Sequence, residues 1–204
     1  MRPLALGGLA LVLAACSPRP EATPTVAPSA AAAPSVGDAP TTDEPRTIVF
    51  VRHAEKASDG TQDPPLTEVG EMRAQCLVTM LRSFGATHVF ATEFVRTQAT
   101  VEPLAEAVDL SVEVISAADA HAWSRALEGL PPGARAVVAG HSNTIPALVQ
   151  ALGGEAGELD DDGNIPHDEY DRMIVMVRGS GPAATSVFEY CANTAENTVQ
   201  GGED

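Results

Sequence analysis

The sequence predicts a three-layer α/β/α sandwich on a mostly parallel sheet, with an antiparallel hairpin at its C-terminal end. Short apolar runs, rich in β-branched residues, alternate with stretches of helical periodicity through the middle of the chain. Most of these runs carry no charge, as expected of strands that are covered on both faces. The last two runs, 173–177 and 185–190, are joined by a Gly-Ser-Gly-Pro turn that is typical of a hairpin.

The strands are expected at 47–51, 88–91, 112–115, 136–139, 173–177 and 185–190, and the helices at 67–84, 97–108, 119–130 and 145–152. Thr67 is the expected N-cap of the first helix, and Gly85 is expected to end it. The third strand carries a charge and should lie near a sheet edge. In the first helix a spaced set of side chains is expected to face the sheet, namely Val69, Met72, Cys76, Leu77, Met80 and Phe84.

The N-terminal segment resembles an export signal. After Arg2, an apolar run from Leu4 to Ala15 is too short to span a bilayer comfortably, and it ends in Leu-Ala-Ala-Cys. That ending resembles the lipobox of bacterial lipoproteins, which implies removal of residues 1–15 and a lipid on Cys16. Ser17 then implies an outer-membrane lipoprotein that faces the periplasm. An ordinary secretory signal with a chance cysteine is the alternative.

Residues 16–45 are rich in Ala, Pro, Thr and Ser, and they have too few large apolar side chains to fold. We expect a disordered linker there, a folded domain over 46–193 and a flexible tail over 194–204. Cys76 and Cys191 remain inside the domain. Cys76 falls on the apolar face of a helix, so a plain buried thiol and a disulfide both stay open.

The chain has a net charge of −16, which argues against binding to nucleic acid or to anionic lipid, so only the lipid would hold it at a membrane. Basic and imidazole groups nevertheless follow three of the expected strands: Arg52 and His53, then Arg96, then His141. Ligands of open α/β sheets bind at the carboxyl ends of the strands. Arginine bonds two phosphate oxygens at once, and neutral imidazole is a nucleophile near neutral pH. A phosphate pocket is therefore predicted.

Four segments in order, 51–55, 65–70, 96–100 and 138–143, resemble the histidine phosphatase superfamily, phosphoglycerate mutase-like, in its short form. The resemblance runs from 46 to about 190. It implies a phosphomonoester hydrolase in which His53 takes the phosphoryl group. Arg52 and Arg96 would hold the phosphoryl oxygens, and His141 would contact them. No metal and no other cofactor is implied.

Further site residues are expected around this pocket. Lys56, Asn143 and Glu55 are candidates for contacting the substrate. The sequence departs from the family at Ala54, where Gly is usual, and it shows no clear proton-donating glutamate. Asp119 is the best candidate acid, followed by Glu55 and Glu113, although Asp119 fits an N-cap equally well.

The sequence thus favours a phosphatase in the cell envelope that acts on a small phosphorylated substrate or a phosphoprotein. The alternative is a catalytically weak lipoprotein of the same fold that binds phosphate. A mutase is disfavoured because the domain is short. A metal site built on His53 and His141 is disfavoured because two arginines would repel a cation.

Overall fold

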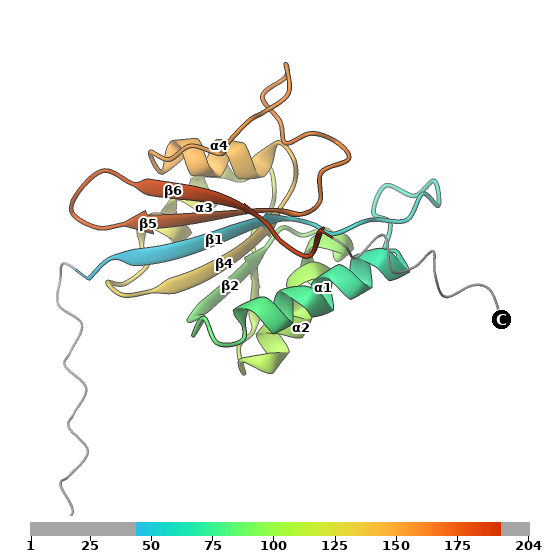
Figure 1. The fold of residues 1–204 in the computed structure, drawn as a ribbon, viewed down its shortest axis with the longest axis horizontal. Helices are drawn as coiled ribbons and strands as arrows, with labels where there is room; N and C mark the ends of the chain where they lie inside the picture. The colour runs from blue at the N-terminus through green and yellow to red at the C-terminus, as the bar shows by residue number, and fades with distance from the viewer. Residues whose placement is uncertain (1–43, 193–204) are drawn as a thin grey trace, which may run out of the picture. The chain divides into compact units, whose positions relative to one another are not determined.

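The structure, a computed structural model, describes residues 44–192 of the 204-residue chain (Figure 1). The predicted signal peptide, Cys16, most of the linker and the C-terminal tail lie outside the described residues. The strands are β1 (Arg46–Arg52), β2 (His88–Ala91), β3 (Val112–Val114), β4 (Arg135–Gly140), β5 (Arg172–Arg178) and β6 (Ala184–Glu189). The helices are α1 (Glu68–Leu81), α2 (Val95–Ala107), α3 (Ala120–Glu128) and α4 (Thr144–Ala151). None of these helices is long and apolar enough to cross a bilayer.

The six strands form one sheet in the order β3-β2-β4-β1-β5-β6. β1 pairs in parallel with β4 and antiparallel with β5, and β5 and β6 form the expected antiparallel hairpin. β3 lies at one edge, as its charge predicted. Residues 48–51 of β1 are fully buried, which explains why this central part of the strand is wholly apolar up to Arg52.

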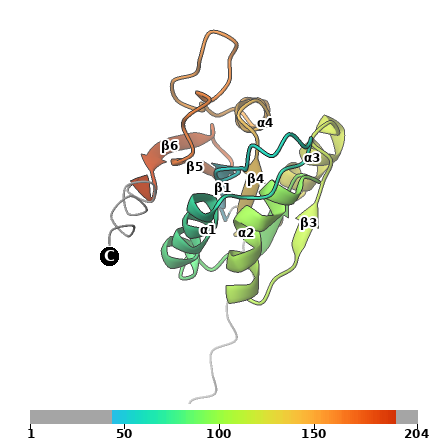
Figure 2. The ribbon, with the colours of Figure 1, turned by 90° about the vertical axis from the view of Figure 1, so that its right-hand side faces the viewer.

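Helices cover both faces of the sheet, so the predicted three-layer fold class is confirmed (Figures 1 and 2). α1 and α2 pack on one face through residues such as Leu77 and Leu104. α3 and α4 pack on the other face through residues such as Trp123 and Ile145. The alternating side chains of β1 and β4 fill both layers.

The face that α1 turns inward differs from the prediction. Thr67 caps the helix as expected, and its hydroxyl accepts a hydrogen bond from Gly70 N. However, the buried side of α1 contains Gly70, Arg73, Ala74, Leu77 and Leu81, whereas Met80 is 47% exposed. The rotation follows from a close approach: a Cβ on Gly70 would stand 2.3 Å from the carbonyl oxygen of Glu55. The helix also ends at Leu81, before the turn that Gly85 closes.

The partners of Arg73 explain why a charged residue lies on the buried face of α1. Its guanidinium makes a bidentate ion pair with Glu55 and donates to the carbonyl oxygens of Tyr190 and Cys191. A disulfide joins Cys191 to Cys76 on the same helix. The structure thus selects the disulfide, one of the two alternatives that the sequence left open. Together these contacts link α1 to Glu55, which follows β1, and to the two residues that follow β6.

α2 begins at Val95, two residues before the expected start. A residue outside the helix satisfies its first backbone N–H, because Val95 N donates to both carboxylate oxygens of Asp63. The earlier start places Arg96 inside the helix rather than in the preceding turn, so a rigid element carries this side chain.

Candidate phosphoryl-transfer site

The carboxyl ends of β1 and β4 bring His53 and His141 together. Arg52 of β1 lies opposite Gly140 of β4, and His53 N donates to the carbonyl oxygen of Gly140 over 2.8 Å. The two imidazole centroids are 5.3 Å apart. Both side chains line a cavity of about 470 Å³. Parallel pairing of two strands that are each followed by a histidine therefore creates the centre of the site.

His53 is oriented by its own backbone neighbour. Its Nδ1 lies 2.8 Å from the carbonyl oxygen of Ala54, and since a carbonyl only accepts, Nδ1 carries the proton. Nε2 is then the unprotonated nitrogen. Burial, reinforced by the positive charges of Arg52 and Arg96 and by His141, lowers the pKa of His53 to about 3, although the bond to Ala54 opposes the shift. The imidazole is therefore neutral at physiological pH, with one lone pair available.

His141 is held by a chain of hydroxyls. Its Nε2 lies 2.9 Å from Thr92 Oγ1, which lies 2.7 Å from Thr97 Oγ1. The Thr97 hydroxyl in turn reaches the carbonyl oxygen of Phe94. Burial and the charge of Arg96 lower the pKa of His141 to about 4. Because Nε2 of His141 bonds to Thr92, its Nδ1 is the nitrogen available to a ligand in the cavity.

Arg52 is a fully enclosed side chain with two separate tasks. Its Nη1 donates to the carbonyl oxygens of Pro166, His167 and Glu169 over 2.9–3.0 Å, and its guanidinium lies 4.2 Å from the ring centroid of Tyr170. Among the contacts within 44–192, Nη2 has no protein acceptor and Nε is buried without one. One nitrogen thus fixes a loop, while the rest of the fork is available to an anion.

Arg96 reaches the same cavity from the first turn of α2. Its guanidinium lies 4.3 Å from the Phe94 ring centroid, and Nη1 pairs with Asp63 at 3.2 Å. Its Nε is buried without a protein acceptor in the described part of the chain. Asp63 therefore positions Arg96 from the outer side and leaves part of the guanidinium for a ligand.

The remaining predicted site residues divide into two groups. Lys56 and Asn143 line the cavity, together with Ser142 and Thr144. Glu55 and Asp119 do not line it. Glu55 pairs with Arg73, and Asp119 accepts from Ala122 N as the N-cap of α3, which confirms the capping role.

The third candidate acid, Glu113, lies on the edge strand β3 and lines a different, smaller cavity. The Ala54 methyl is also absent from the site. It is fully buried in a small cluster with Leu66 and Ala74, so this departure from the family does not reach the cavity.

His167 is a lining residue that the sequence analysis missed. It lies in the loop between α4 and β5, which has no periodicity to indicate which side chains turn inward. Its position follows from tertiary contacts: Arg52 holds the backbone of 166–169, and Ile165 N donates to the carbonyl oxygen of Ser142. Among residues 44–192, no carboxylate lines the cavity, whereas Arg52, Lys56 and Arg96 all do. Such a lining favours an anion.

No group of three or more His, Cys, Asp or Glu side chains in the described residues could hold a metal ion. The donors around the cavity are guanidinium, ammonium, imidazole and hydroxyl groups. Guanidinium and ammonium repel cations, so these residues suit an oxyanion better than a divalent metal.

The lowered pKa values of the two histidines predict a pH-dependent stability. The unfolded chain protonates each imidazole near pH 6.5, whereas the folded chain does so only near 3 to 4. The free energy of unfolding should therefore fall as the pH drops below about 6.5, by up to about 1.4 kcal/mol per pH unit for each histidine. Urea unfolding at pH 7, 6 and 5 measures this slope. The double variant His53→Gln/His141→Gln should flatten it, and an unchanged slope would contradict the assignment.

Residues 48–119 match the histidine phosphatase superfamily, branch 1. The chain is also 30% identical over 118 residues to an 8-oxo-(d)GTP phosphatase of Mycolicibacterium smegmatis, a match that covers 52% of this chain and 37% of the relative. The matched segments span only about a third of the length of the curated relatives.

Two solved structures share the fold over nearly their whole length. The protein histidine phosphatase SixA, complexed with tungstate, is 22% identical with a TM-score of 0.53, and the match covers 70% of this chain and 96% of that one. A phosphoglycerate mutase from Bacillus anthracis is 13% identical with a TM-score of 0.55, covering 77% and 98%. These two matches show that the chain has the predicted phosphoglycerate mutase-like fold.

Proposed function

We propose that this chain is a phosphomonoester hydrolase that works through a phosphohistidine on His53, as its match to the histidine phosphatase superfamily suggests. The observation that carries the proposal is the state of His53. It is a neutral imidazole with Nδ1 committed to Ala54, inside a cavity that Arg52 and Arg96 line. A nucleophilic nitrogen among phosphate-binding cations has the parts that phosphoryl transfer requires.

In the first step, the lone pair of His53 Nε2 attacks phosphorus and the bond to the ester oxygen breaks. Arg52 and Arg96 bind the equatorial oxygens, whose charge they stabilise. A protonated His141 Nδ1 would donate to the same phosphoryl group, because a bound dianion favours the imidazolium. Water then attacks phosphorus, the N–P bond breaks, and inorganic phosphate leaves with neutral His53 restored.

The leaving oxygen needs a proton, and no carboxylate of the described residues lines the cavity to supply one. We assign this duty to His167, a lining imidazole carried by the loop that Arg52 fixes. Histidine is suited to donating protons near neutral pH. Substrates with acidic leaving groups, such as aryl phosphates, should depend little on this group.

His167→Ala should therefore lower hydrolysis of an alkyl phosphate, such as glycerol phosphate, by about 10²-fold. The same variant should lower hydrolysis of p-nitrophenyl phosphate by less than about threefold, because nitrophenolate leaves without a proton. His121→Ala, an exposed residue of α3, is the matched control. Equal losses on both substrates would show that His167 does not act as the acid.

A binding protein of the same fold remains the second candidate, and the lack of a lining carboxylate favours it. The two functions separate on p-nitrophenyl phosphate with the whole chain. Steady release of nitrophenol, with an acid-labile phosphoprotein on rapid quenching, supports the hydrolase. Saturable binding of phosphate or tungstate without turnover supports the binding protein. Small phosphate esters and phosphoproteins are both proposed substrates, since both present a phosphoryl group to the cationic lining of the cavity.

We also propose that the chain is an outer-membrane lipoprotein facing the periplasm, with its lipid on Cys16. The N-terminal sequence supports this, and the disulfide between Cys76 and Cys191 fits an oxidising compartment. Cys16→Ser should move the protein from the membrane fraction to the soluble fraction on cell lysis. Unchanged membrane fractionation of this variant would contradict lipid anchoring.

A further inference from the structure

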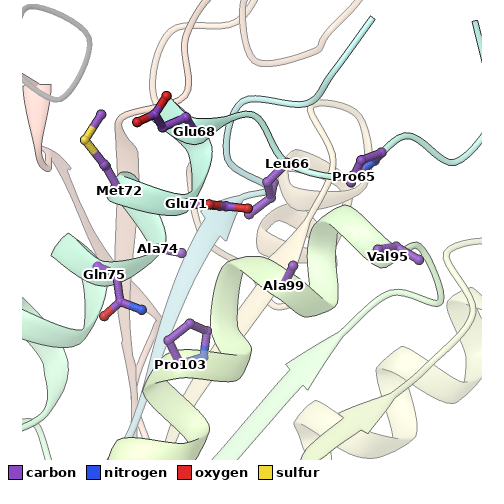
Figure 3. Close-up of a pocket in the computed structure, with 10 residues that line it drawn as sticks. All are labelled: Pro65, Leu66, Glu68, Glu71, Met72, Ala74, Gln75, Val95, Ala99 and Pro103. Atoms are coloured by element: carbon purple, nitrogen blue, oxygen red, sulfur yellow. The ribbon is translucent and has the colours of Figure 1, made fainter. Parts of the chain in front are cut away.

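A second cavity, of about 620 Å³, lies in the groove between α1 and α2 (Figure 3). We name it the helix groove. Its α1 wall carries Met72, and its α2 wall carries Val95, Ala99 and Pro103 at a spacing of four residues, so that one stripe of the helix faces it. Val95 is 50% exposed, which leaves apolar surface open in this groove. Its volume is that of a small-molecule site.

The floor of the helix groove is buried and packs against the residue that follows His53. Leu66 and Ala74 form this floor, and both are buried with Ala54 in one small apolar cluster. Ala54 N donates to Thr100 Oγ1 on α2, and the carbonyl oxygen of Ala54 accepts from His53 Nδ1. The groove is therefore built on the segment that orients His53, but it shares no lining residue with the catalytic cavity.

Two carboxylates give the apolar groove a definite charge. Glu68 and Glu71 line it from the first turn of α1, and in Figure 3 the Glu71 side chain extends from the helix toward Leu66. The remaining lining residues carry no charge. Neither glutamate forms an ion pair with another residue of the described chain. Their place at a helix N-terminus explains why acids are tolerated there, although that preference does not require an apolar cavity beside them.

We propose that the helix groove binds a small amphipathic amine, meaning an apolar or aromatic body that carries one ammonium group. The apolar walls would bury the body, as in other small-molecule sites. The ammonium group would lie between the carboxylates of Glu68 and Glu71, which have no competing cation in the groove. Anionic ligands are excluded from this site by the same two charges, so phosphate esters and amines use separate cavities.

The test follows methionine methyl signals by NMR in the whole chain. The described region contains four of the five methionines, and of these only Met72 lines the groove. Met80 is on the same helix, is 47% exposed and lies outside the groove, so it serves as an internal control. The probes are 4-phenylbutylamine, the neutral 4-phenylbutan-1-ol and the anionic 4-phenylbutanoate, which share one apolar body.

Titration with the amine should shift the Met72 methyl saturably and leave Met80 in place. The alcohol should bind about fivefold to tenfold more weakly, and the carboxylate more weakly still. Glu68→Gln/Glu71→Gln should remove the preference for the amine over the alcohol. Glu102→Gln/Glu106→Gln removes the same charge from exposed positions of α2 outside the groove, and it should keep the preference.

Three outcomes would overturn the proposal. The first is a Met72 methyl that does not respond to the amine, and the second is equal affinity for all three probes. The third is an unchanged preference in Glu68→Gln/Glu71→Gln, with the fold of each variant verified by its circular dichroism. None of these outcomes depends on phosphatase activity, so the amine site and the hydrolase function fail independently.

Discussion

His53→Ala should lower the hydrolysis of p-nitrophenyl phosphate by about 10⁴-fold or more, because no other group near phosphorus offers an unprotonated, neutral nitrogen in the same place. The arginines are unaffected by the change. Tungstate should therefore still bind within about tenfold of its original affinity. Steady-state rates and calorimetric titration with tungstate measure the two effects.

The acid-labile phosphoprotein should also disappear in this variant. His121→Ala, which removes an exposed imidazole from α3, should retain both the rate and the intermediate. A His53→Ala protein that keeps more than a tenth of its activity would exclude His53 as the nucleophile. If tungstate binding is lost as well, the histidine is needed to form the oxyanion site itself, and the division of labour described above is wrong.

Arg52→Lys should have the second largest effect, and it should lower activity and stability together. A lysine keeps the charge but cannot donate to three carbonyl oxygens and to a phosphate oxygen from one planar group. We expect kcat/KM to fall by about 10²-fold to 10³-fold. The free energy of unfolding should fall by about 2 kcal/mol, because the partly buried carbonyl oxygens of Pro166, His167 and Glu169 lose a charged donor.

Arg96→Lys is the informative comparison. It should reduce activity to a similar degree, since Arg96 lines the same cavity. Its only ion pair in the described chain is with the partly exposed Asp63, so the stability loss should stay below about 1 kcal/mol. Urea unfolding and steady-state kinetics on both variants separate the tasks. An Arg52→Lys protein as stable as the original would show that the contacts with 166–169 contribute little.

Local patterns predicted the elements well where one residue type decides the outcome. Thr67 is an N-cap as expected, and Asp119 takes the capping role that the sequence offered beside the role of proton donor, since a short side-chain oxygen at a helix start bonds the first free backbone N–H groups. Residues 48–51 of the uncharged run lie in the buried centre of the sheet. Each of these features depends on neighbours within one turn or one strand, which the sequence displays directly.

Patterns failed where a distant group competes for the same position. Arg73 lies on the buried face of α1 because Glu55 and the carbonyl oxygens after β6 satisfy its charge, and hydrophobic spacing contains no sign of that pairing. His167 enters the catalytic cavity because Arg52, more than a hundred residues earlier, holds the backbone of its loop. The helix groove likewise arises only when α1 and α2 pack side by side.

The sequence by itself determined the alternation of strands and helices, the layered fold and the identity of the groups that end the strands. Each of those follows from short-range preferences and from the burial of apolar runs. Only the tertiary structure decided that His53 is neutral with Nε2 free, that Cys76 pairs with Cys191, and that no carboxylate within residues 44–192 lines the cavity. These properties depend on burial and on partners far apart in the chain, which only folding brings close together in space.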